Sequence, residues 1–201
     1  MNKVNYNREM ENIIENLKEK KSLLLHSCCG PCSTAVLKRL TDRFDISIYF
    51  FNPNIYPESE FYKRAETQKD VIAKMGGSIE LIVGSYEADK YFESVKGLED
   101  LGEGSLRCKN CYEFRLREAA RYAKANSFDY FTTTLSVSPY KNAAWINEIG
   151  RELEEEVGIK FLYADFKKKE GYKESIVLSK EYNLYRQDYC GCKFSKDEAL
   201  K

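Results

Sequence analysis

The sequence predicts a single α/β domain in three layers, with a mainly parallel sheet covered by helices on both faces, as in Rossmann-like and nucleotide-hydrolase-like folds. Two observations lead to this fold class. Short apolar runs alternate with segments of helical spacing, and the runs are unbroken, as in strands that are buried on both faces. The 201 residues are enough for one sizeable core, and no linker rich in Ser, Pro or Gly divides them.

The first half of the chain opens with a charged amphipathic segment, residues 1–21, which we expect to be a helical extension to an α/β domain of residues 22–201. The apolar run SLLLHS predicts the first strand of that domain, and the residues after it show helical spacing. A second apolar run precedes a long helix, which the Gly76-Gly77 pair ends. The expected order is strand 22–27, helix 34–40, strand 45–52, helix 58–75 and strand 78–84.

The second half continues the alternation. The run YFTTTL is rich in β-branched residues, which favour strands. The expected elements are helix 108–126, strand 130–135, helix 142–157, strand 160–166 and a helix near 172–181. In parallel sheets of this kind, ligands bind at the carboxyl ends of the strands. Cys28 and Cys29, directly after the first strand, should therefore lie at that edge.

Charge and hydropathy restrict the class of protein. Acidic and basic residues number 32 each, so no overall basic excess points to nucleic acid, although a local basic face can still bind it. The N-terminal charged residues are not followed by the apolar stretch of a signal peptide. No run approaches the ~18 apolar residues of a membrane span. We therefore expect a cytoplasmic protein, in which grouped cysteines more often bind metals or cycle catalytically than form structural disulfides.

The seven cysteines stand in three groups: Cys28, Cys29 and Cys32, then Cys108 and Cys111, then Cys190 and Cys192. Thiols grouped in this way indicate a metal, an iron–sulfur cluster or redox chemistry rather than simple packing. The odd number argues against a closed disulfide framework.

Two groups favour metal binding. Two residues between Cys108 and Cys111 let both sulfurs turn toward one ion or cluster, and the amides at the predicted helix start would stabilise their negative charge. Cys28 and Cys29 can supply two ligands only on a turn, which the following Gly-Pro provides. Together the four thiolates match a [4Fe–4S] cluster. A structural zinc site that holds the loops together is the alternative.

The other cysteines allow more than one role. A single residue between Cys190 and Cys192 is short for two ligands of one cluster, but Gly191 permits either a shared metal or a strained, easily reduced disulfide. Cys32 lies at the start of a predicted helix, whose dipole should lower the pKa of its thiol. Cys32 is either a ligand of a second metal or a packing residue.

Histidine and the basic residues also have alternative roles. His26, the one histidine, is either a hydrogen-bonded core residue or the partner of a cluster sulfur. Three basic residues share one predicted helix face, with Arg115 nearby: Arg117, Arg121 and Lys124. They form either a solvated surface or, if Lys63-Arg64 and the lysines at 167–169 converge on them, a phosphate-binding surface.

Five motifs carry a resemblance to a known family. They are HSCCGPC at 26–32, NPNIYP at 52–57, RCKNCY at 107–112, TTL at 133–135 with SPYK at 138–141, and YRQDYCGC at 185–192 followed by Ser195. With these motifs in order, the chain from Leu23 to Ser195 resembles the QueH family of epoxyqueuosine reductases. The double cysteine combined with Tyr-Cys-Gly-Cys is highly specific.

The resemblance implies an oxidoreductase that converts the epoxide of epoxyqueuosine to the cyclopentene of queuosine, using iron–sulfur chemistry without cobalamin. Its substrate is tRNA that carries epoxyqueuosine at the wobble position, and the step is the last of queuosine biosynthesis. The domain of residues 22–201 is then the catalytic domain. The reaction takes two electrons and two protons, so an electron donor, which the sequence does not identify, is also required.

The resemblance also assigns roles to the cysteines. The implied ligands of the [4Fe–4S] cluster are Cys28, Cys29, Cys108 and Cys111. The implied redox-active pair, a disulfide when oxidised, is Cys190 and Cys192. A second iron belongs to the family picture, and some relatives have Asp where Cys32 stands. Because both residue types bind iron, this difference fits Cys32 as a ligand of that iron.

An open position on such an iron would polarise the epoxide oxygen. Candidate proton donors, chosen because they adjoin the cysteine and Ser-Pro motifs in sequence, are Asp188, Tyr189 and Lys141. Reduction on tRNA requires that the modified base leaves the anticodon stack while Lys and Arg hold phosphates.

Two other classes of protein fit parts of the pattern. A tRNA-thiolating enzyme of the nucleotide-binding α/β kind would share the fold and the cluster. The loop after the first strand, however, holds Cys-Cys-Gly-Pro-Cys where pyrophosphate binding requires glycine and serine with an aspartate, so we do not expect ATP use. A zinc-stapled binding module without enzymatic activity is the other alternative.

Overall fold

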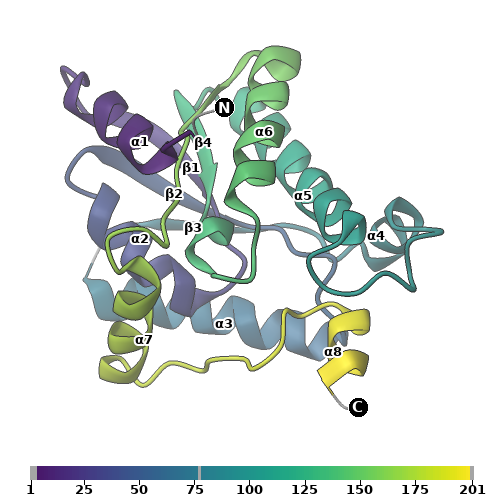
Figure 1. The fold of residues 1–201 in the computed structure, drawn as a ribbon. Helices are drawn as coiled ribbons and strands as arrows, with labels where there is room; N and C mark the ends of the chain where they lie inside the picture. Colours follow the sequence, from purple (N-terminus) through teal and green to yellow (C-terminus); the bar gives the residue numbers. More distant parts are fainter. Residues whose placement is uncertain (1–3, 77, 200–201) are drawn as a thin grey trace.

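One sheet of five strands, all parallel, organises the chain in the order β3-β2-β1-β4-β5 (Figure 1). This computed structural model describes residues 4–76 and 78–199. The strands are β1 (Lys21–His26), β2 (Phe44–Phe50), β3 (Glu80–Val83), β4 (Tyr130–Thr133) and β5 (Lys160–Phe161). The predicted three-layer α/β fold is confirmed, and the sheet is wholly rather than mainly parallel. Because β1 is the central strand, the turn that follows it lies in the middle of the carboxyl edge.

Eight α-helices lie in the described part of the chain. They are α1 (Tyr6–Glu15), α2 (Gly30–Leu40), α3 (Glu58–Met75), α4 (Ala88–Ser94), α5 (Leu106–Ala125), α6 (Ala143–Leu153), α7 (Gly171–Glu181) and α8 (Lys193–Ala199). A 3₁₀ turn at Thr134–Val137 follows β4, and a π-helical turn at Glu154–Gly158 follows α6. None of the helices described is long and apolar enough to cross a membrane.

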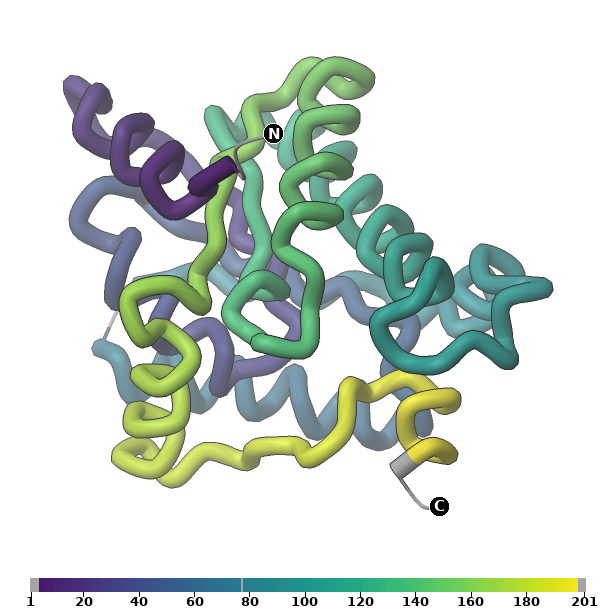
Figure 2. The backbone as a smooth tube through the Cα atoms, in the orientation of Figure 1, coloured from purple at the N-terminus to yellow at the C-terminus, as the bar shows by residue number. Residues whose placement is uncertain are grey.

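The helices cover both faces of the sheet because side chains along each strand alternate between them. Leu23 and Leu25 of β1 pack in one apolar cluster with residues of α1, α2 and α3, while Leu24 packs in a second cluster with α5 and α6. All three leucines are fully buried. The trace in Figure 2 shows the C-terminal segment running along α3 between α7 and α8.

Most elements are where the sequence places them, and α3 has both predicted ends. The predicted strand 160–166 is shorter, because the side chain of Asn147 takes over its pairing. Asn147 Nδ2 donates to Ala164 O over 2.9 Å, and Asn147 Oδ1 accepts from Ala164 N over 2.9 Å. The strand predicted at 130–135 ends at Thr133, whose hydroxyl accepts from Leu135 N and caps the 3₁₀ turn. The short helices α4 and α8 are not predicted from the sequence.

The N-terminal extension is helical over Tyr6–Glu15 only, and Met10 of this helix is 1% exposed in the core cluster it shares with α2. Residues 1–3 of the predicted extension lie outside the described residues, as do residues 200–201 of the predicted domain. The division of the chain at residue 21 stays a prediction. Gly76 ends α3 in the left-handed conformation, with φ 73°, whereas Gly77 of the predicted stop lies outside the described residues.

Gly30 lets α2 approach α3 closely. A Cβ at this position would lie 2.9 Å from Thr67 O and 3.0 Å from Val71 Cγ2. We expect Gly30→Ala to push the helices apart and lower the free energy of unfolding by about 1–3 kcal/mol. Urea unfolding followed by circular dichroism measures this change.

The matched control is Gly102→Ala, because a Cβ at Gly102 would meet none of the described atoms within 4 Å. Equal unfolding midpoints for the two variants would contradict the close approach.

Candidate active site at the carboxyl edge of the sheet

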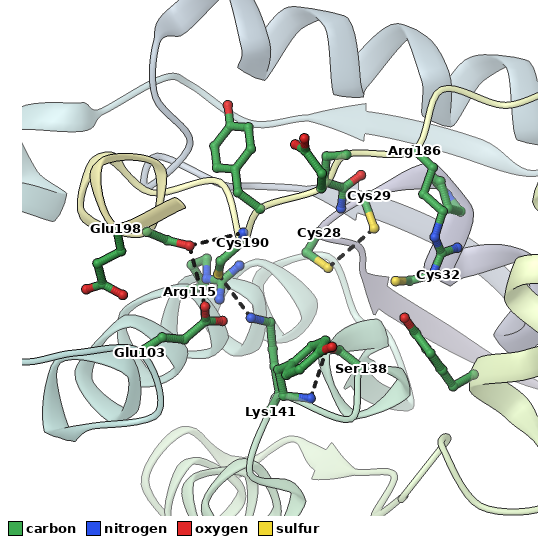
Figure 3. A pocket seen from close by; sticks show the side chains of 17 residues that line it. Cys28, Cys29, Cys32, Glu103, Arg115, Ser138, Lys141, Arg186, Cys190 and Glu198 are labelled. Atoms are coloured by element: carbon green, nitrogen blue, oxygen red, sulfur yellow. Dashed lines mark hydrogen bonds between the residues drawn. The ribbon is translucent and has the colours of Figure 1, made fainter. Parts of the chain in front are cut away.

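A cavity of about 530 Å³ lies beyond the carboxyl end of β1. Its lining comes from the β1–α2 turn and the start of α2, the α4–α5 loop, α5, the loop before α6, α7, the segment that joins α7 to α8, and α8. Figure 3 shows Cys28, Cys29 and Cys32 on one side of this cavity, with Cys190 on the other and Lys141 beneath. The first cysteine group and Cys190 of the last group therefore face one space.

The first cysteine group forms the tightest sulfur cluster. The sulfurs of Cys28, Cys29 and Cys32 all lie within 4.8 Å of one another, with Cys28 Sγ and Cys29 Sγ 3.9 Å apart. The turn is held to the 3₁₀ turn that follows β4, because Cys28 N donates to Thr134 Oγ1 over 3.3 Å. Since α2 begins at Gly30, Cys32 lies in its first turn. The arrangement can hold a thiophilic metal ion.

Negative charge in this group concentrates on Cys28. Hydrogen bonds from the thiols of Cys29 and Cys32 lower the pKa of Cys28 well below the ordinary range of a thiol. The Cys32 thiol donates to Cys28 and to Cys29, and these hydrogen bonds raise the pKa of Cys32. Burial raises it further. The prediction that the helix dipole lowers the pKa of Cys32 is therefore wrong, because the adjacent thiol outweighs the dipole.

Cys108 and Cys111 lie in the first two turns of α5 and are 8% and 6% exposed. Cys108 Sγ accepts a hydrogen bond from Gly104 N over 3.3 Å. Burial raises the pKa of both thiols, and for Cys108 it outweighs the lowering effect of the Gly104 N–H. Among the described residues, neither sulfur lies close enough to Cys28 and Cys29 to form one group that could hold a metal ion. The four predicted cluster ligands are therefore not drawn into one tight group.

Cys190 and Cys192 face different surroundings. Cys190 lines the cavity, and its Sγ lies 3.1 Å from Lys141 Nζ. Cys192 is 6% exposed and packs with Cys111 in a small apolar cluster. Between them, Gly191 has φ 121°, and a Cβ there would lie 2.7 Å from Arg64 Nη1, so this position requires glycine. All seven cysteines are thiols in this structure.

The charge of this pair rests on Cys190. The hydrogen bond from the Cys192 thiol, followed by the charge of Lys141, lowers the pKa of Cys190 well below its ordinary value. The pKa of Cys192 is raised, because its thiol donates to Cys190 and is buried. The group that faces the cavity is therefore a thiolate with a lysine beside it, and the protonated thiol lies behind it.

Side chains of α3 hold the segment that carries this pair. Glu60 Oε1 accepts from Tyr185 Oη over 3.0 Å and from Arg64 Nε over 2.7 Å. Arg64 Nη1 in turn donates to Cys190 O over 3.2 Å. Arg64 is 2% exposed, so a buried ion pair fixes the backbone at Cys190.

Arg115 lies deep in the wall of the cavity, 2% exposed and one turn after Cys111 on α5. Its Nε donates to Cys111 O over 3.2 Å, and its Nη1 donates to Asn52 Oδ1 over 3.2 Å. Its Nη2 is buried and has no hydrogen-bond partner among the described residues. Burial works to lower the pKa of Arg115, but the nearby thiols of Cys111, Cys28 and Cys190 raise it, so the guanidinium is charged.

His26 is a core residue. It is 0% exposed, with Nδ1 2.8 Å from Thr133 Oγ1 and Nε2 3.1 Å from Phe51 O. Burial, followed by the charge of Arg115, lowers the pKa of His26 to about 4. The imidazole is therefore neutral, and its hydrogen bonds go to the core rather than to a cluster sulfur.

The basic residues proposed as a phosphate-binding surface are largely engaged within the protein. Arg117 pairs with Glu113 and Glu156, and Lys124 Nζ donates to Gly158 O. Farther along the chain, Lys167 and Lys169 pair with Asp165 and Glu11. Lys63 packs over the Tyr185 ring, whereas Arg121 is exposed. The structure therefore favours the solvated-face alternative for Arg117 and Lys124, and it removes Arg115 from any such surface.

The three candidate proton donors, Lys141, Asp188 and Tyr189, all line the cavity. The sequence analysis did not single out Glu103, which joins them from the α4–α5 loop. Glu103 Oε2 accepts from Ser195 Oγ over 3.5 Å, and burial, followed by the charge of Cys190, raises its pKa. No motif contains Glu103, whereas Arg186, also in the lining, lies within YRQDYCGC, which could have indicated it.

Comparison with known proteins gives a consistent result. Residues 23–198 match the model of the family described as epoxyqueuosine reductase QueH. A relative with that name from Staphylococcus epidermidis is 43% identical over 202 residues, which cover 96% of this chain and 85% of the relative. Another from Thermotoga maritima is 40% identical over 177 residues, 87% of this chain and 90% of the relative.

The fold also resembles a solved structure. A protein from Methanocaldococcus jannaschii, described as a predicted subunit of tRNA methyltransferase, superposes with a TM-score of 0.50 and 12% identity. The match covers 79% of this chain and 76% of that protein. At this identity the likeness concerns the fold alone.

The contact between Lys141 and Cys190 predicts a pH-dependent reactivity. Lys141→Met removes the cation that stabilises the Cys190 thiolate, so the pKa of Cys190 should rise by about one to three units. Alkylation of Cys190 by iodoacetamide should then reach half its maximal rate at a correspondingly higher pH. Mass spectrometry of the Cys190 peptide at a series of pH values measures the rate.

Lys193→Met serves as the control, because Lys193 is exposed and packs against Tyr56 instead. An unchanged alkylation profile in Lys141→Met would show that Lys141 does not determine the charge of Cys190.

Proposed function

The chain belongs to the QueH family of epoxyqueuosine reductases, and from this membership we propose that it reduces epoxyqueuosine to queuosine at the wobble position of tRNA, the last step of queuosine biosynthesis. The observation that carries the proposal is the single cavity into which Cys28, Cys29, Cys32 and Cys190 all face. Its volume of about 530 Å³ is within the usual range of small-molecule sites and suits one modified nucleobase.

We propose Cys28, Cys29, Cys108 and Cys111 as the ligands of a [4Fe–4S] cluster. The donor set suits it: all four are thiols, which soft metals and iron–sulfur clusters prefer, and Arg115 offers a buried positive charge nearby. Four thiolates of such a cluster bind four different irons, so they do not have to lie in one tight group. When bound, the cluster supplies electrons one at a time.

A second iron would be held beside these ligands by Cys32. The short distances within the first cysteine group support this role, because Cys32 Sγ lies within 4.8 Å of the sulfurs of both Cys28 and Cys29. The chemistry it would supply is Lewis-acid polarisation of the epoxide oxygen. No cobalamin is required in this proposal.

Cys190 and Cys192 form the proposed redox-active pair. The conversion of an epoxide to an alkene and water consumes two electrons and two protons. Oxidation of the Cys190 thiolate and the Cys192 thiol to a disulfide releases two electrons and one proton, so a residue of the cavity wall supplies the second proton. Lys141 holds Cys190 as the thiolate at the cavity, while Cys192 keeps its proton behind it. An electron donor, still to be identified, would return the disulfide to two thiols.

Residues of the cavity wall would donate protons to the substrate. Lys141, Asp188 and Tyr189 are the proposed donors, because all three line the cavity. The tRNA would present the modified base out of the anticodon stack, and this substrate is consistent with a cytoplasmic location.

The family proposal is tested by its product. Anaerobically reconstituted protein should be brown and should convert epoxyqueuosine in tRNA to queuosine, detected by mass spectrometry of the digested nucleosides. In Cys108→Ser a harder, far less acidic donor replaces the thiolate, so the visible absorbance and the activity should be lost together.

Full iron, sulfide and activity in Cys108→Ser would contradict the ligand assignment. A colourless, zinc-loaded and inactive wild type would favour the binding module, and transfer of sulfur to tRNA would favour the thiolating enzyme.

Cys192→Ala distinguishes a redox pair from a ligand pair. Because Cys192 is outside the proposed ligand set, the variant should keep its iron and sulfide but lose turnover. Iron and sulfide counting, together with the product assay, checks this. The loss of one cluster's worth of iron would instead place Cys192 among the metal ligands.

A further inference from the structure

We infer that Arg115 is the counter-cation of the thiolate-bound metal centre and raises its reduction potential. This inference rests on the proposed iron–sulfur function and adds a residue to it. No motif led to this role, and the sequence instead grouped Arg115 with surface arginines.

The first argument is position. Cys108, Cys111 and Arg115 are spaced three and four residues apart on α5, so their side chains share one face of the helix. The guanidinium of Arg115 donates to Cys111 O and lines the same cavity as Cys28 and Cys190. Arg115 therefore contacts one of the two cysteine pairs that we assign to the cluster and shares a cavity wall with the other.

The second argument is charge. Three arginines are each 2% exposed, and two of them have carboxylate partners: Arg64 pairs with Glu60 at 2.7 Å and Arg107 with Glu198 at 3.1 Å. Arg115 has no ion pair with a carboxylate anywhere in the described part of the chain. An unpaired buried cation is strongly destabilising, so an anion has to offset it. Cys28 and Cys190, whose thiols have lowered pKa values and line the same cavity, are the nearby groups that supply negative charge, and Cys111 would add to it once it binds metal as a thiolate.

The third argument is the unused donor. Arg115 Nη2 is buried without a partner, while Nε and Nη1 are already committed to Cys111 O and Asn52 Oδ1. These bonds hold the guanidinium within the wall of the cavity. Arg64 Nη2 also lacks a partner, but Arg64 already has the carboxylate of Glu60. Because Arg115 is only 2% exposed and lines the cavity with Cys28 and Cys190, its remaining donor is available to the protein's own thiolate centre rather than to a tRNA phosphate.

The consequence concerns the energy of the reduced state. An added electron makes a thiolate-bound cluster more negative, and a fixed cation beside it stabilises that state more than the oxidised one. Arg115 should therefore raise the reduction potential, so that the centre is more easily reduced.

The test uses the full chain with its metal centre reconstituted anaerobically. In Arg115→Gln, an EPR-monitored redox titration should give a more negative midpoint potential than in the wild type, while Arg115→Lys, which keeps the charge, should lie between the two. Arg117→Gln is the matched control, since this arginine is two residues away but pairs with Glu113 and Glu156, and its potential should be unchanged.

A second variant neutralises Arg115 without removing it. Asn52→Asp is isosteric and places a carboxylate against Arg115 Nη1, although it also loses the hydrogen bond from Asn52 Nδ2 to Ser27 O. Where the variant keeps its full iron and sulfide, the potential should again become more negative. This variant decides the question if Arg115→Gln fails to keep the cluster. Unchanged potentials in the variants that retain full iron and sulfide would overturn the role of Arg115 but leave the proposed cluster standing. A wild type without iron and sulfide would overturn the proposed cluster as well.

Discussion

The side-chain amide of Asn52 joins the elements on which the site depends. Fully buried after the end of β2, it donates to Ser27 O over 2.8 Å and accepts from Arg115 Nη1 over 3.2 Å. The first bond fixes the turn that carries Cys28, and the second fixes the helix that carries Cys108 and Cys111. One polar group, with no contact to solvent, therefore ties the turn of the first cysteine pair to the helix of the second.

The two cavity-facing cysteine groups share an electrostatic pattern. In each, one thiol at the cavity has a lowered pKa, and its neighbours have raised pKa values because they donate hydrogen bonds to it: Cys28 has Cys29 and Cys32, and Cys190 has Cys192. Two cations, Arg115 and Lys141, offset the negative charge that results. The wall is thus arranged to hold concentrated negative charge at two separate points.

The sequence predicted what depends on local pattern. It placed the sheet, both ends of α3, and Cys28 and Cys29 at the carboxyl edge. It missed features that depend on packing across the fold. The strand at 160–166 is cut short by Asn147, a partner from another element, and Arg115 looks like a surface residue in sequence because its burial follows from how α5 meets the sheet. Glu103 belongs to no motif, and only the path of its loop brings it to the cavity.

The attachment of the C-terminal segment has a genetic consequence. Cys190 is held by Glu60 and Arg64, side chains of α3 that lie far away in sequence and, within the described part of the chain, make no hydrogen bond to the cysteines of the first two groups. An allele that alters Glu60 would leave every cysteine intact and still displace one sulfur of the pair. In a screen for lost function, such alleles would be classed with substitutions of Cys190 itself. A compensating substitution would be sought at Tyr185, which donates a hydrogen bond to Glu60, rather than near the sheet.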